Sequence, residues 1–381
     1  MLGPSTIAAF LERGHHELAA QMLSFTTDRI APLGNPKTDD AARDVARRIV
    51  PLLAEGGCYR AIAKQDWRGC CIVREQLAYV SPLADAVFAL QALGTTPLML
   101  SDNDAAKDAW VTPAHDGKLM MAFAMTEAEA GSDVAALATT ATRDGDAYVL
   151  NGSKTFISNA GIADLYVVFT TIDATLKKTG ITCFAVPAET AGCEFVRAQV
   201  MSAPHPLGDI RFTDCRVPID ARLGEEGAGL GLGFATLERL RPTVGAAACG
   251  MAARALVEAT THARTRQQFG HTISDFQLVK QKLARMATDL DAARLLVYRA
   301  AYDLDRGAGP NPMASAMAKA FATEAAQKIV DDAVQILGGR GVLADHPVDH
   351  LYRSVRGLRI YEGTTEIQHL IIAGHLLAND G

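Results

Sequence analysis

Four segments of the sequence hold residue types that could bind and transform a ligand. Phe123-Ala-Met-Thr-Glu-Ala-Glu-Ala-Gly-Ser-Asp133 contains small hydroxyls and a glycine, and exposed main-chain N–H groups there suit a hydrogen-bonding rim and an anionic phosphate. Asn151-Gly-Ser-Lys-Thr-Phe-Ile-Ser-Asn159 is the second segment. Its Phe156 offers an aromatic face to a flat ring, and Ser158, two residues on, points the same way along a strand. The alternative is that Phe156 belongs to the core of a β domain.

The other two segments lie in the second half of the chain. Arg264-Thr-Arg-Gln-Gln-Phe-Gly270 makes Arg266 a candidate cation for a phosphate. The alternative is a solvated helix C-terminus, where the helix dipole favours a cation. The fourth segment is Gln335-Ile-Leu-Gly-Gly-Arg-Gly341, followed by Ile360-Tyr-Glu-Gly-Thr-Thr-Glu-Ile-Gln368.

The usual catalytic motifs are absent from the sequence, which has no G-x-S-x-G, no Walker loop and no H-E-x-x-H. Gly229-Leu-Gly-Leu-Gly233 is similar to a phosphate loop, but no strand of a βαβ unit precedes it, and we interpret it as a domain linker. The ten histidines form no ligand cluster. We interpret His15-His16 as a solvated helix face and expect no metal.

Composition excludes several classes of protein. The 381 residues are 49% hydrophobic and 21% charged, typical of a soluble globular protein with two or three domains. The net charge of −6 without a basic stripe argues against nucleic-acid binding. The apolar stretch 86–101 is broken by Gly94 and Pro97 and is too short to span a bilayer, so no membrane association is expected. Seven scattered cysteines indicate reduced thiols and a cytoplasmic location.

Helices and strands of the predicted fold must position the four segments. Apolar residues at three- and four-residue spacing predict helices before residue 120, most clearly at 41–54 and 73–93. Short β-branched and aromatic runs predict antiparallel strands at 147–150, 154–158, 165–171, 181–186, 194–199 and 209–212. Asn151-Gly152 is predicted to form a two-residue hairpin turn between the first two.

The C-terminal part of the chain predicts a helix bundle. Ser274 with Gln277 suits a capping box, and apolar residues from Phe276 to Ala300 then form one seam. A loop at 306–312 and a helix from Pro312 to Gly338-Gly339 follow. The predicted class is α+β, with an N-terminal helical domain (1–120), a middle antiparallel β-barrel or sandwich domain (121–226) and a C-terminal helix-bundle domain (227–381).

The four segments, in this order and across this α-β-α organisation, resemble the acyl-CoA dehydrogenase flavoproteins. The resemblance is clear from about residue 83 to the C-terminus. It implies FAD as cofactor, an acyl-CoA substrate, an electron-transfer flavoprotein as electron acceptor, and a homo-oligomer, usually a tetramer. The implied pathway class is fatty acid or carboxylic acid catabolism.

The resemblance also assigns ligand contacts to individual residues. Flavin contacts in the first two segments are Phe123, Met125, Thr126, Gly131, Ser132, Phe156 and Ser158. The cofactor contacts implied in the second half of the chain are Arg266, Gln268, Phe269, Gln277, Gln335, Gly338, Gly339, Thr364 and Glu366. Of these, the arm around residue 266 and the turn at 335–339 are implied to reach the flavin of a neighbouring subunit. Substrate contacts are implied for Ser132, Glu238, Arg241, Tyr361 and Gly363.

In this family the Glu of the Tyr-Glu-Gly-Thr motif is the catalytic base, which implies that role for Glu362. It would remove the α-proton beside a thioester, while the β-hydrogen leaves as hydride to flavin N5 and a 2,3-enoyl-CoA forms. Some members take the base from a central helix, at the residue before an Arg. That residue is Leu240 here, which cannot act as a base. Glu238 and Arg241 alternatively form a surface pair.

Two other functions stay open at this point. One is a flavin oxidase or monooxygenase on the same fold, although such relatives usually lack the Glu at the position of Glu362. The other is a non-catalytic flavoprotein that binds DNA or a partner. The segment 57–74 lacks the family's Pro-Glu-aromatic-Gly-Gly pattern, so the size and shape of the acyl group are not predicted.

Overall fold

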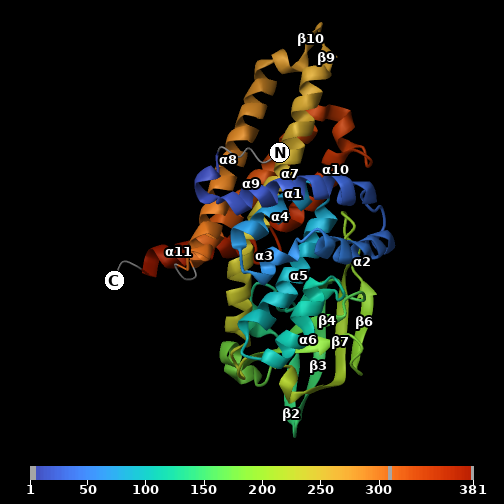
Figure 1. Cartoon of the computed structure of the whole chain (residues 1–381), viewed down its shortest axis with the longest axis vertical. Coiled ribbons are helices and arrows are strands. Elements are labelled where there is room, and N and C mark those ends of the chain that lie inside the picture. Colours follow the sequence, from blue (N-terminus) through green and yellow to red (C-terminus); the bar gives the residue numbers. More distant parts are fainter. Residues whose placement is uncertain (1–5, 308–310, 379–381) are drawn as a thin grey trace. The chain divides into compact units, whose positions relative to one another are not determined.

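The computed structural model describes residues 6–307 and 311–378, and its elements follow the order helical, β, helical (Figure 1). The helices are α1 (Arg13–Phe25), α2 (Asp39–Glu55), α3 (Tyr59–Ala63), α4 (Trp67–Val80), α5 (Pro82–Leu100), α6 (Asp104–His115), α7 (Gly229–Thr265), α8 (Gln277–Asp305), α9 (Pro312–Leu337), α10 (Pro347–Leu358) and α11 (Thr365–Ala378). The strands are β1 (Met121–Ala124), β2 (Thr140–Asp144), β3 (Ala147–Ser158), β4 (Leu165–Thr171), β5 (Ile181–Pro187), β6 (Cys193–Ala198), β7 (Leu207–Pro218), β8 (Arg222–Leu223), β9 (Gln267–Gln268) and β10 (His271–Thr272).

The chain divides into two compact units. The helical unit comprises Met1–Gly34, Gln65–Asp85 and Glu238–Gly381, and the sheet unit comprises Asn35–Lys64 and Ala86–Leu237. The predicted α+β class is confirmed. The division into three domains at 120 and 226 stays a prediction.

The sheet unit is built on a sheet with the strand order β6-β7-β3-β2-β4-β5-β8, with β1 pairing with β4. Its central strands are apolar on both faces. On β4, Leu165, Val167 and Phe169 join one hydrophobic cluster, while Tyr166 and Val168 join the other. Strict alternation along a strand sends successive side chains to opposite faces, so the strand is covered on both sides. Most pairs are antiparallel, as predicted, but β1 and β2 each pair with β4 in parallel.

The predicted hairpin turn at Asn151-Gly152 is wrong. Residues 147–158 form the single strand β3, and Gly152 lies at a register shift against β7 with φ 146°. A β-bulge uses the same positive-φ tolerance that favours a turn, so the two cannot be separated from the residue types alone. The actual two-residue turn joins β2 to β3 at Gly145-Asp146. Strands β1 and β2 were not predicted.

In the helical unit, α4 packs against α1 and α8, and α9 packs against α8, α10 and α11. Close approach of α7 to α4 depends on Gly250, because a Cβ there would lie 2.1 Å from the Glu75 carbonyl oxygen. Arg294 and Tyr298 of α8 bind the buried Glu75 carboxylate at 2.8 and 3.0 Å. At the far end, β9 and β10 pair where the chain passes from α7 to α8 (Figure 1).

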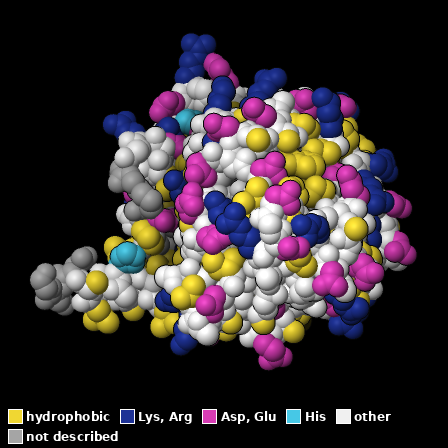
Figure 2. All heavy atoms as spheres, turned by 90° about the horizontal axis from the view of Figure 1, so that it is seen from below, with side chains coloured by type: hydrophobic (Ala, Val, Ile, Leu, Met, Phe, Trp, Pro, Cys, Tyr) yellow, Lys and Arg dark blue, Asp and Glu magenta, His cyan; other side chains and the backbone are white. Residues whose placement is uncertain are grey.

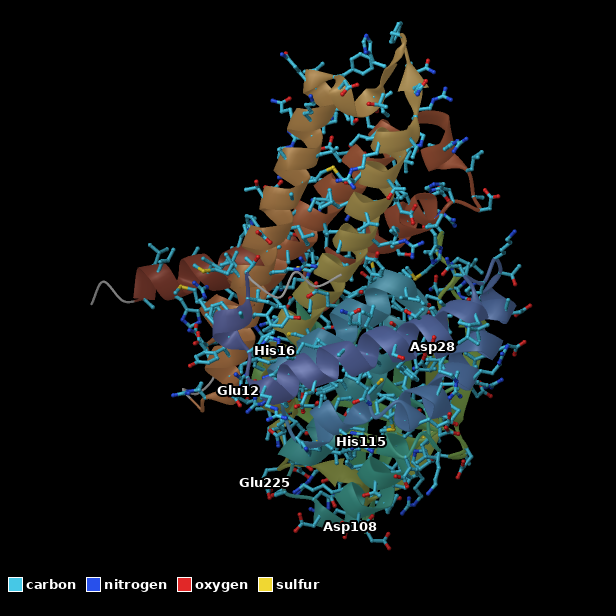
Figure 3. The ribbon with its side chains drawn as sticks, turned by 45° about the horizontal axis from the view of Figure 1, so that its top comes forward. Glu12, His16, Asp28, Asp108, His115 and Glu225 are labelled. Carbon is cyan, nitrogen blue, oxygen red and sulfur yellow. The ribbon has the colours of Figure 1, made fainter. Side chains whose placement is uncertain are left out.

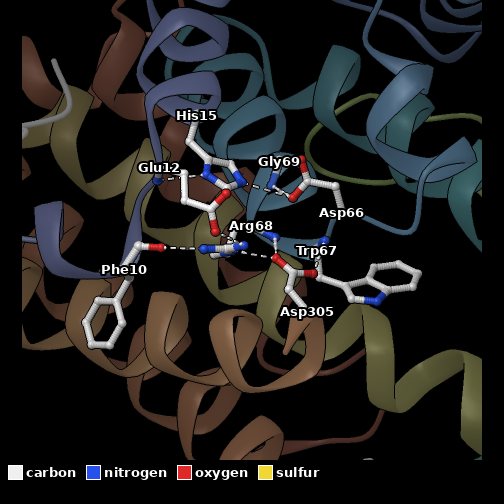
Figure 4. Close-up of polar contacts among 8 residues, drawn as sticks. All are labelled: Phe10, Glu12, His15, Asp66, Trp67, Arg68, Gly69 and Asp305. Carbon is white, nitrogen blue, oxygen red and sulfur yellow. Dashed lines mark hydrogen bonds and ion pairs between the residues drawn. The ribbon is translucent and has the colours of Figure 1, made fainter. Parts of the chain in front are cut away.

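The interpretation of His15-His16 as a solvated face is wrong for His15, which is buried and makes the polar contacts drawn in Figure 4. Its Nδ1 accepts a hydrogen bond from the Glu12 N–H at the start of α1, and its Nε2 lies 3.1 Å from Asp66 Oδ1. Arg68 binds Asp305 in the same cluster. These contacts tie α1 to α4 and α8. His16 is exposed on α1 (Figure 3).

Helix boundaries in the C-terminal part agree only partly with the predictions. Helix α9 begins at Pro312 after the N-cap Asn311 and ends before Gly338, as predicted; residues 308–310 of the predicted loop lie outside the described residues. Ser274 is not an N-cap, because it lies in a 3-10 turn and α8 follows Phe276 without a side-chain cap. Residues 229–233 are not a linker but the first residues of α7.

Helix α5 continues through Gly94 and Pro97, contrary to the predicted break. By length and composition it could cross a membrane, but 83% of its apolar window is buried inside the structure, as in a core helix. All seven cysteines are free thiols.

Candidate active site

Glu362 lies in a tight turn that precedes α11 in the helical unit. Its φ is 55°, and that of the next residue, Gly363, is 89°. A left-handed conformation is unfavourable for a residue with a Cβ and costs about 1–3 kcal/mol, so it persists only where its surroundings hold it. Such strain is concentrated at functional sites, which makes this turn a candidate.

Side chains from three helices hold the carbonyl groups of this turn. Lys319 Nζ of α9 donates to the Gly363 carbonyl at 2.7 Å, and Gln368 Nε2 of α11 donates to the same oxygen at 3.0 Å. The Glu362 carbonyl accepts from Gln368 at 3.3 Å and from Arg241 Nε of α7 at 3.5 Å. Lys319 and Gln368 are fully buried, so these donors are shielded from water. Arg241 and Gly363, both predicted substrate contacts, therefore lie beside the predicted base.

The Glu362 carboxylate is held in a buried and charged environment. Its Oε2 is buried and has no hydrogen-bond partner among the described residues. Burial raises its pKa, and Asp85 acts in the same direction, whereas Arg74, Lys319 and Arg241 oppose the rise. Arg74 is itself fixed by Asp85 at 2.7 and 2.9 Å and by Thr243 at 3.0 Å. An ionisable group with these properties suits proton transfer.

Glu238, predicted as a substrate contact, is also buried in the helical unit. Its Oε1 has no hydrogen-bond partner in the part of the chain that the structure describes. Burial raises its pKa against the opposing charges of Arg239, Arg241 and His375. The alternative of an exposed surface pair is therefore wrong. Tyr361, next to Glu362 in the chain, is exposed.

The predicted flavin contacts of the first two segments lie together in the sheet unit. The Thr155 N–H donates to the Thr126 carbonyl at 3.0 Å, which places the residues after β1 beside the end of β3. Phe156 is 59% exposed with φ 55°, so it is not a core residue. Gly131 and Ser132 are exposed, and a Cβ at Gly131 would meet no atom within 4 Å. An exposed ring beside a polar loop fits a flat cofactor with phosphates.

Two further groups in the sheet unit support these contacts and were not predicted. Lys154 Nζ lies 2.7 Å from Glu127 Oε1 and donates to the Met125 carbonyl at 3.2 Å. His205 Nε2 lies 2.7 Å from Ser158 Oγ, and burial lowers the pKa of His205 to about 4. His205 is therefore a neutral partner for the Ser158 hydroxyl.

The predicted cofactor contacts in the second half of the chain, including those implied to act across subunits, lie mostly on the surface. Phe269 is 90% exposed; also exposed are Arg266, Gln268, Gln277, Gln335, Gly338, Gly339 and Glu366. Thr364 is partly buried.

Family models of the acyl-CoA dehydrogenase middle domain and C-terminal domain match residues 122–215 and 227–377. The chain belongs to the acyl-CoA dehydrogenase family. A 3-(aryl)acrylate reductase of Clostridium sporogenes is 37% identical over 373 residues, which are 95% of this chain and 98% of that protein. Butyryl-CoA dehydrogenase from Megasphaera elsdenii superimposes with a TM-score of 0.90 at 31% identity, over 96% of this chain and 99% of that one. A structure described as the electron transferring flavoprotein of Acidaminococcus fermentans has a TM-score of 0.91 at 32% identity, over 97% and 99%.

Membership of the family confirms the predicted class of enzyme, an oxidoreductase of the acyl-CoA dehydrogenase type. FAD as the cofactor is confirmed for the family, which includes an acyl-CoA dehydrogenase from Bacillus anthracis whose structure was determined in complex with FAD. The exposed Phe156 and the open space at Gly131 fit this cofactor. The individual contacts stay predictions.

Proposed function

We propose that this acyl-CoA dehydrogenase desaturates an acyl-CoA thioester and that Glu362 removes the α-proton. The state of the Glu362 carboxylate carries the proposal: the residue is half-buried, its Oε2 is shielded from solvent without a partner among the described residues, and burial raises its pKa. A base whose pKa approaches the working pH takes a proton most effectively. Leu240 leaves the other helix position of the family without a base.

The reaction balances as the loss of two hydrogens from the acyl chain. Glu362 takes the α-proton, the β-hydrogen leaves with its electron pair, and a double bond forms between the two carbons to give a 2,3-enoyl-CoA. FAD supplies the hydride acceptor when bound. Phe156 would contact its ring, and Thr126, Gly131 and Ser132 would bind its polar groups; Arg241 and Glu238 would contact the substrate. The position of Glu362 Oε2 shields this oxygen from solvent.

Anaerobic bleaching of the purified holoenzyme with a panel of acyl-CoA thioesters tests the proposal. Butyryl-CoA and 3-arylpropionyl-CoA belong in the panel because the relatives are named for a butyryl thioester and for arylacrylates. The proposal expects rapid bleaching with at least one thioester and release of its enoyl product. Absence of bleaching with the whole panel would contradict it. Slow reoxidation by oxygen, compared with an electron-acceptor dye, would exclude an oxidase.

The relative named 3-(aryl)acrylate reductase favours a second candidate, reduction of an α,β-unsaturated acyl compound. The same groups would act in reverse, because Glu362 in its protonated form can return a proton to the α-carbon. Adding an enoyl thioester to the anaerobically reduced enzyme tests this direction. Reoxidation of the flavin far faster than its bleaching by the saturated thioester would favour the reductase.

Assembly, electron acceptor and location complete the proposal. A homotetramer is supported by the exposed apolar residues of α11, among them Leu370, Leu376 and Leu377, and by the exposed Phe269. Figure 2 shows hydrophobic side chains on the projecting C-terminal helix. Apolar surface of this extent is typical of an interface.

An electron-transfer flavoprotein as acceptor is supported by the description of the Acidaminococcus fermentans structure. We place the enzyme in the cytoplasm because its cysteines are free. Membership of the family supports a role in fatty acid or carboxylic acid catabolism.

A further inference from the structure

Lys319 is a buried cation that the proposed reaction does not use. It lies in the middle of α9, within the apolar, alanine-rich stretch 316–322, and its side chain is 0% exposed. A lysine in such a place needs a partner, because transfer of an ammonium from water to the protein interior is costly. Among the described residues, its hydrogen-bond partner is a backbone oxygen, the Gly363 carbonyl at 2.7 Å.

We propose that Lys319 is a positioning residue for the base: it fixes the Glu362–Gly363 turn through the Gly363 carbonyl and holds a positive charge beside the Glu362 carboxylate. The inference rests on the proposed function, since it gives Glu362 the role of base. It assigns no contact with substrate or cofactor to Lys319.

The geometry of the Glu362–Gly363 turn supports the positioning role of Lys319. Glu362 and Gly363 both have positive φ, and an L-residue in that conformation relaxes unless its surroundings hold it. Lys319 and Gln368 donate to the Gly363 carbonyl from two different helices. Removing one of these buried donors would leave the turn less well fixed, and small displacements of a base lower the rate of proton transfer.

The charged groups around Glu362 support the electrostatic role of Lys319. The groups that act on the Glu362 carboxylate are Arg74 of α4, Asp85 of α5, Arg241 of α7 and Lys319 of α9. Lys319 itself is surrounded by Glu362, Arg241, Glu324 and Glu366, and burial lowers its pKa to about 8, so it is charged below that pH. An opposite charge close to a carboxyl lowers its pKa by roughly 1–3 units. Without Lys319, the pKa of Glu362 would rise further.

The test uses the holoenzyme and the rate of anaerobic flavin bleaching as a function of pH. Lys319→Met should move the acid limb to higher pH by about one unit or more, and should lower the plateau rate. Lys319→Arg, which keeps the charge, should restore the acid limb. Lys328→Met removes the same charge from an exposed position on the same helix and should leave the profile unchanged. Gln368→Leu removes a neutral donor and should lower the plateau without moving the acid limb.

Infrared titration of the substrate-free holoenzyme gives a second readout that does not depend on turnover. The band of the protonated Glu362 carboxyl, identified by its absence in Glu362→Gln, should persist to higher pH in Lys319→Met. If that variant does not fold, Lys319→Gln removes the charge and is measured instead. Profile and band unchanged from wild type in the charge-removing variant would overturn the inference. Normal bleaching by Glu362→Gln would instead overturn the proposed function.

Discussion

Lys154 and Glu127 form a buried ion pair that anchors the segment carrying the proposed flavin contacts. The Lys154 ammonium on β3 lies 2.7 Å from Glu127 Oε1, and the same carboxylate accepts hydrogen bonds from the N–H groups of Ala138 and Thr139 at 2.6 and 2.9 Å. Lys154 also donates to the Met125 carbonyl. One pair of side chains thus holds both ends of the 125–139 segment to the sheet.

Replacement of Lys154 should destabilise the protein and weaken FAD retention together. Lys154→Met leaves the Glu127 carboxylate buried without its cation, which typically costs about 3–5 kcal/mol. Lys118→Met is the control, because Lys118 pairs with Asp116 at the surface and should change stability by less than about 1 kcal/mol. Denaturant unfolding and FAD dissociation measure the two effects. If the two substitutions change stability and FAD dissociation equally, the buried pair does not anchor the 125–139 segment.

Acid should weaken the same pair. Burial raises the pKa of Glu127. The Lys154 charge and the hydrogen bonds to the Glu127 carboxylate outweigh burial and lower this pKa below its usual 4.5. The folded state therefore binds this proton less readily than the unfolded state. The ionised Glu127 therefore contributes to the free energy of unfolding above about pH 4.5. This contribution is lost as pH falls through the lower pKa that Glu127 has in the folded state. The difference in unfolding free energy between wild type and Glu127→Gln should shrink as pH falls below about 4.5; a difference that stays constant would contradict the assignment.

Phe156→Ala should change the flavin and hardly change stability. The ring is 59% exposed in the structure, so its removal should cost within about 1 kcal/mol rather than the 3–5 kcal/mol typical of a buried aromatic. The flavin absorption spectrum should shift, because the ring would no longer contact the cofactor. Phe195→Ala, at a 44% exposed site on β6, is the matched control and should leave the spectrum unchanged. An unshifted spectrum in Phe156→Ala would remove this contact from the proposal.

Arg266→Ala should weaken FAD retention only through assembly. Arg266 is exposed at the tip between α7 and α8, and the family resemblance implies that it reaches the flavin of a neighbouring subunit. Each protomer should stay folded by circular dichroism while FAD dissociates faster from the oligomer. Arg264→Ala, on the same exposed arm, is the control. A monomer that retains FAD as firmly as the oligomer would contradict the trans contact.

The sequence predicts the fold class and the long elements well because their periodicity is strong. Strand β4 was predicted at its full length, since every residue from Leu165 to Thr171 is apolar or β-branched and buried. Asn151-Gly152 was misread because a bulge and a turn use the same residue types. Ser274 was misread because its capping pattern precedes a 3-10 turn instead of α8.

The base was predicted from a motif, but the groups that hold it were not. Arg74 and Asp85 lie on consecutive helices, and Lys319 lies far from both in sequence; only the folded chain brings their charges to Glu362. The one available signal was a single lysine within an alanine-rich stretch of α9. Likewise, nothing in the sequence pairs His205 with Ser158.

Rapid-mixing measurement of flavin bleaching in Glu362→Gln tests the central claim most directly. The substitution is nearly isosteric, so the protein should fold, retain FAD and bind acyl-CoA with unchanged affinity. General-base catalysis is worth about 10²–10⁴-fold, and Leu240 occupies the family's other base position, so the bleaching rate should fall by at least the upper end of that range. A bleaching rate within about tenfold of wild type would contradict the assignment of Glu362 as the base.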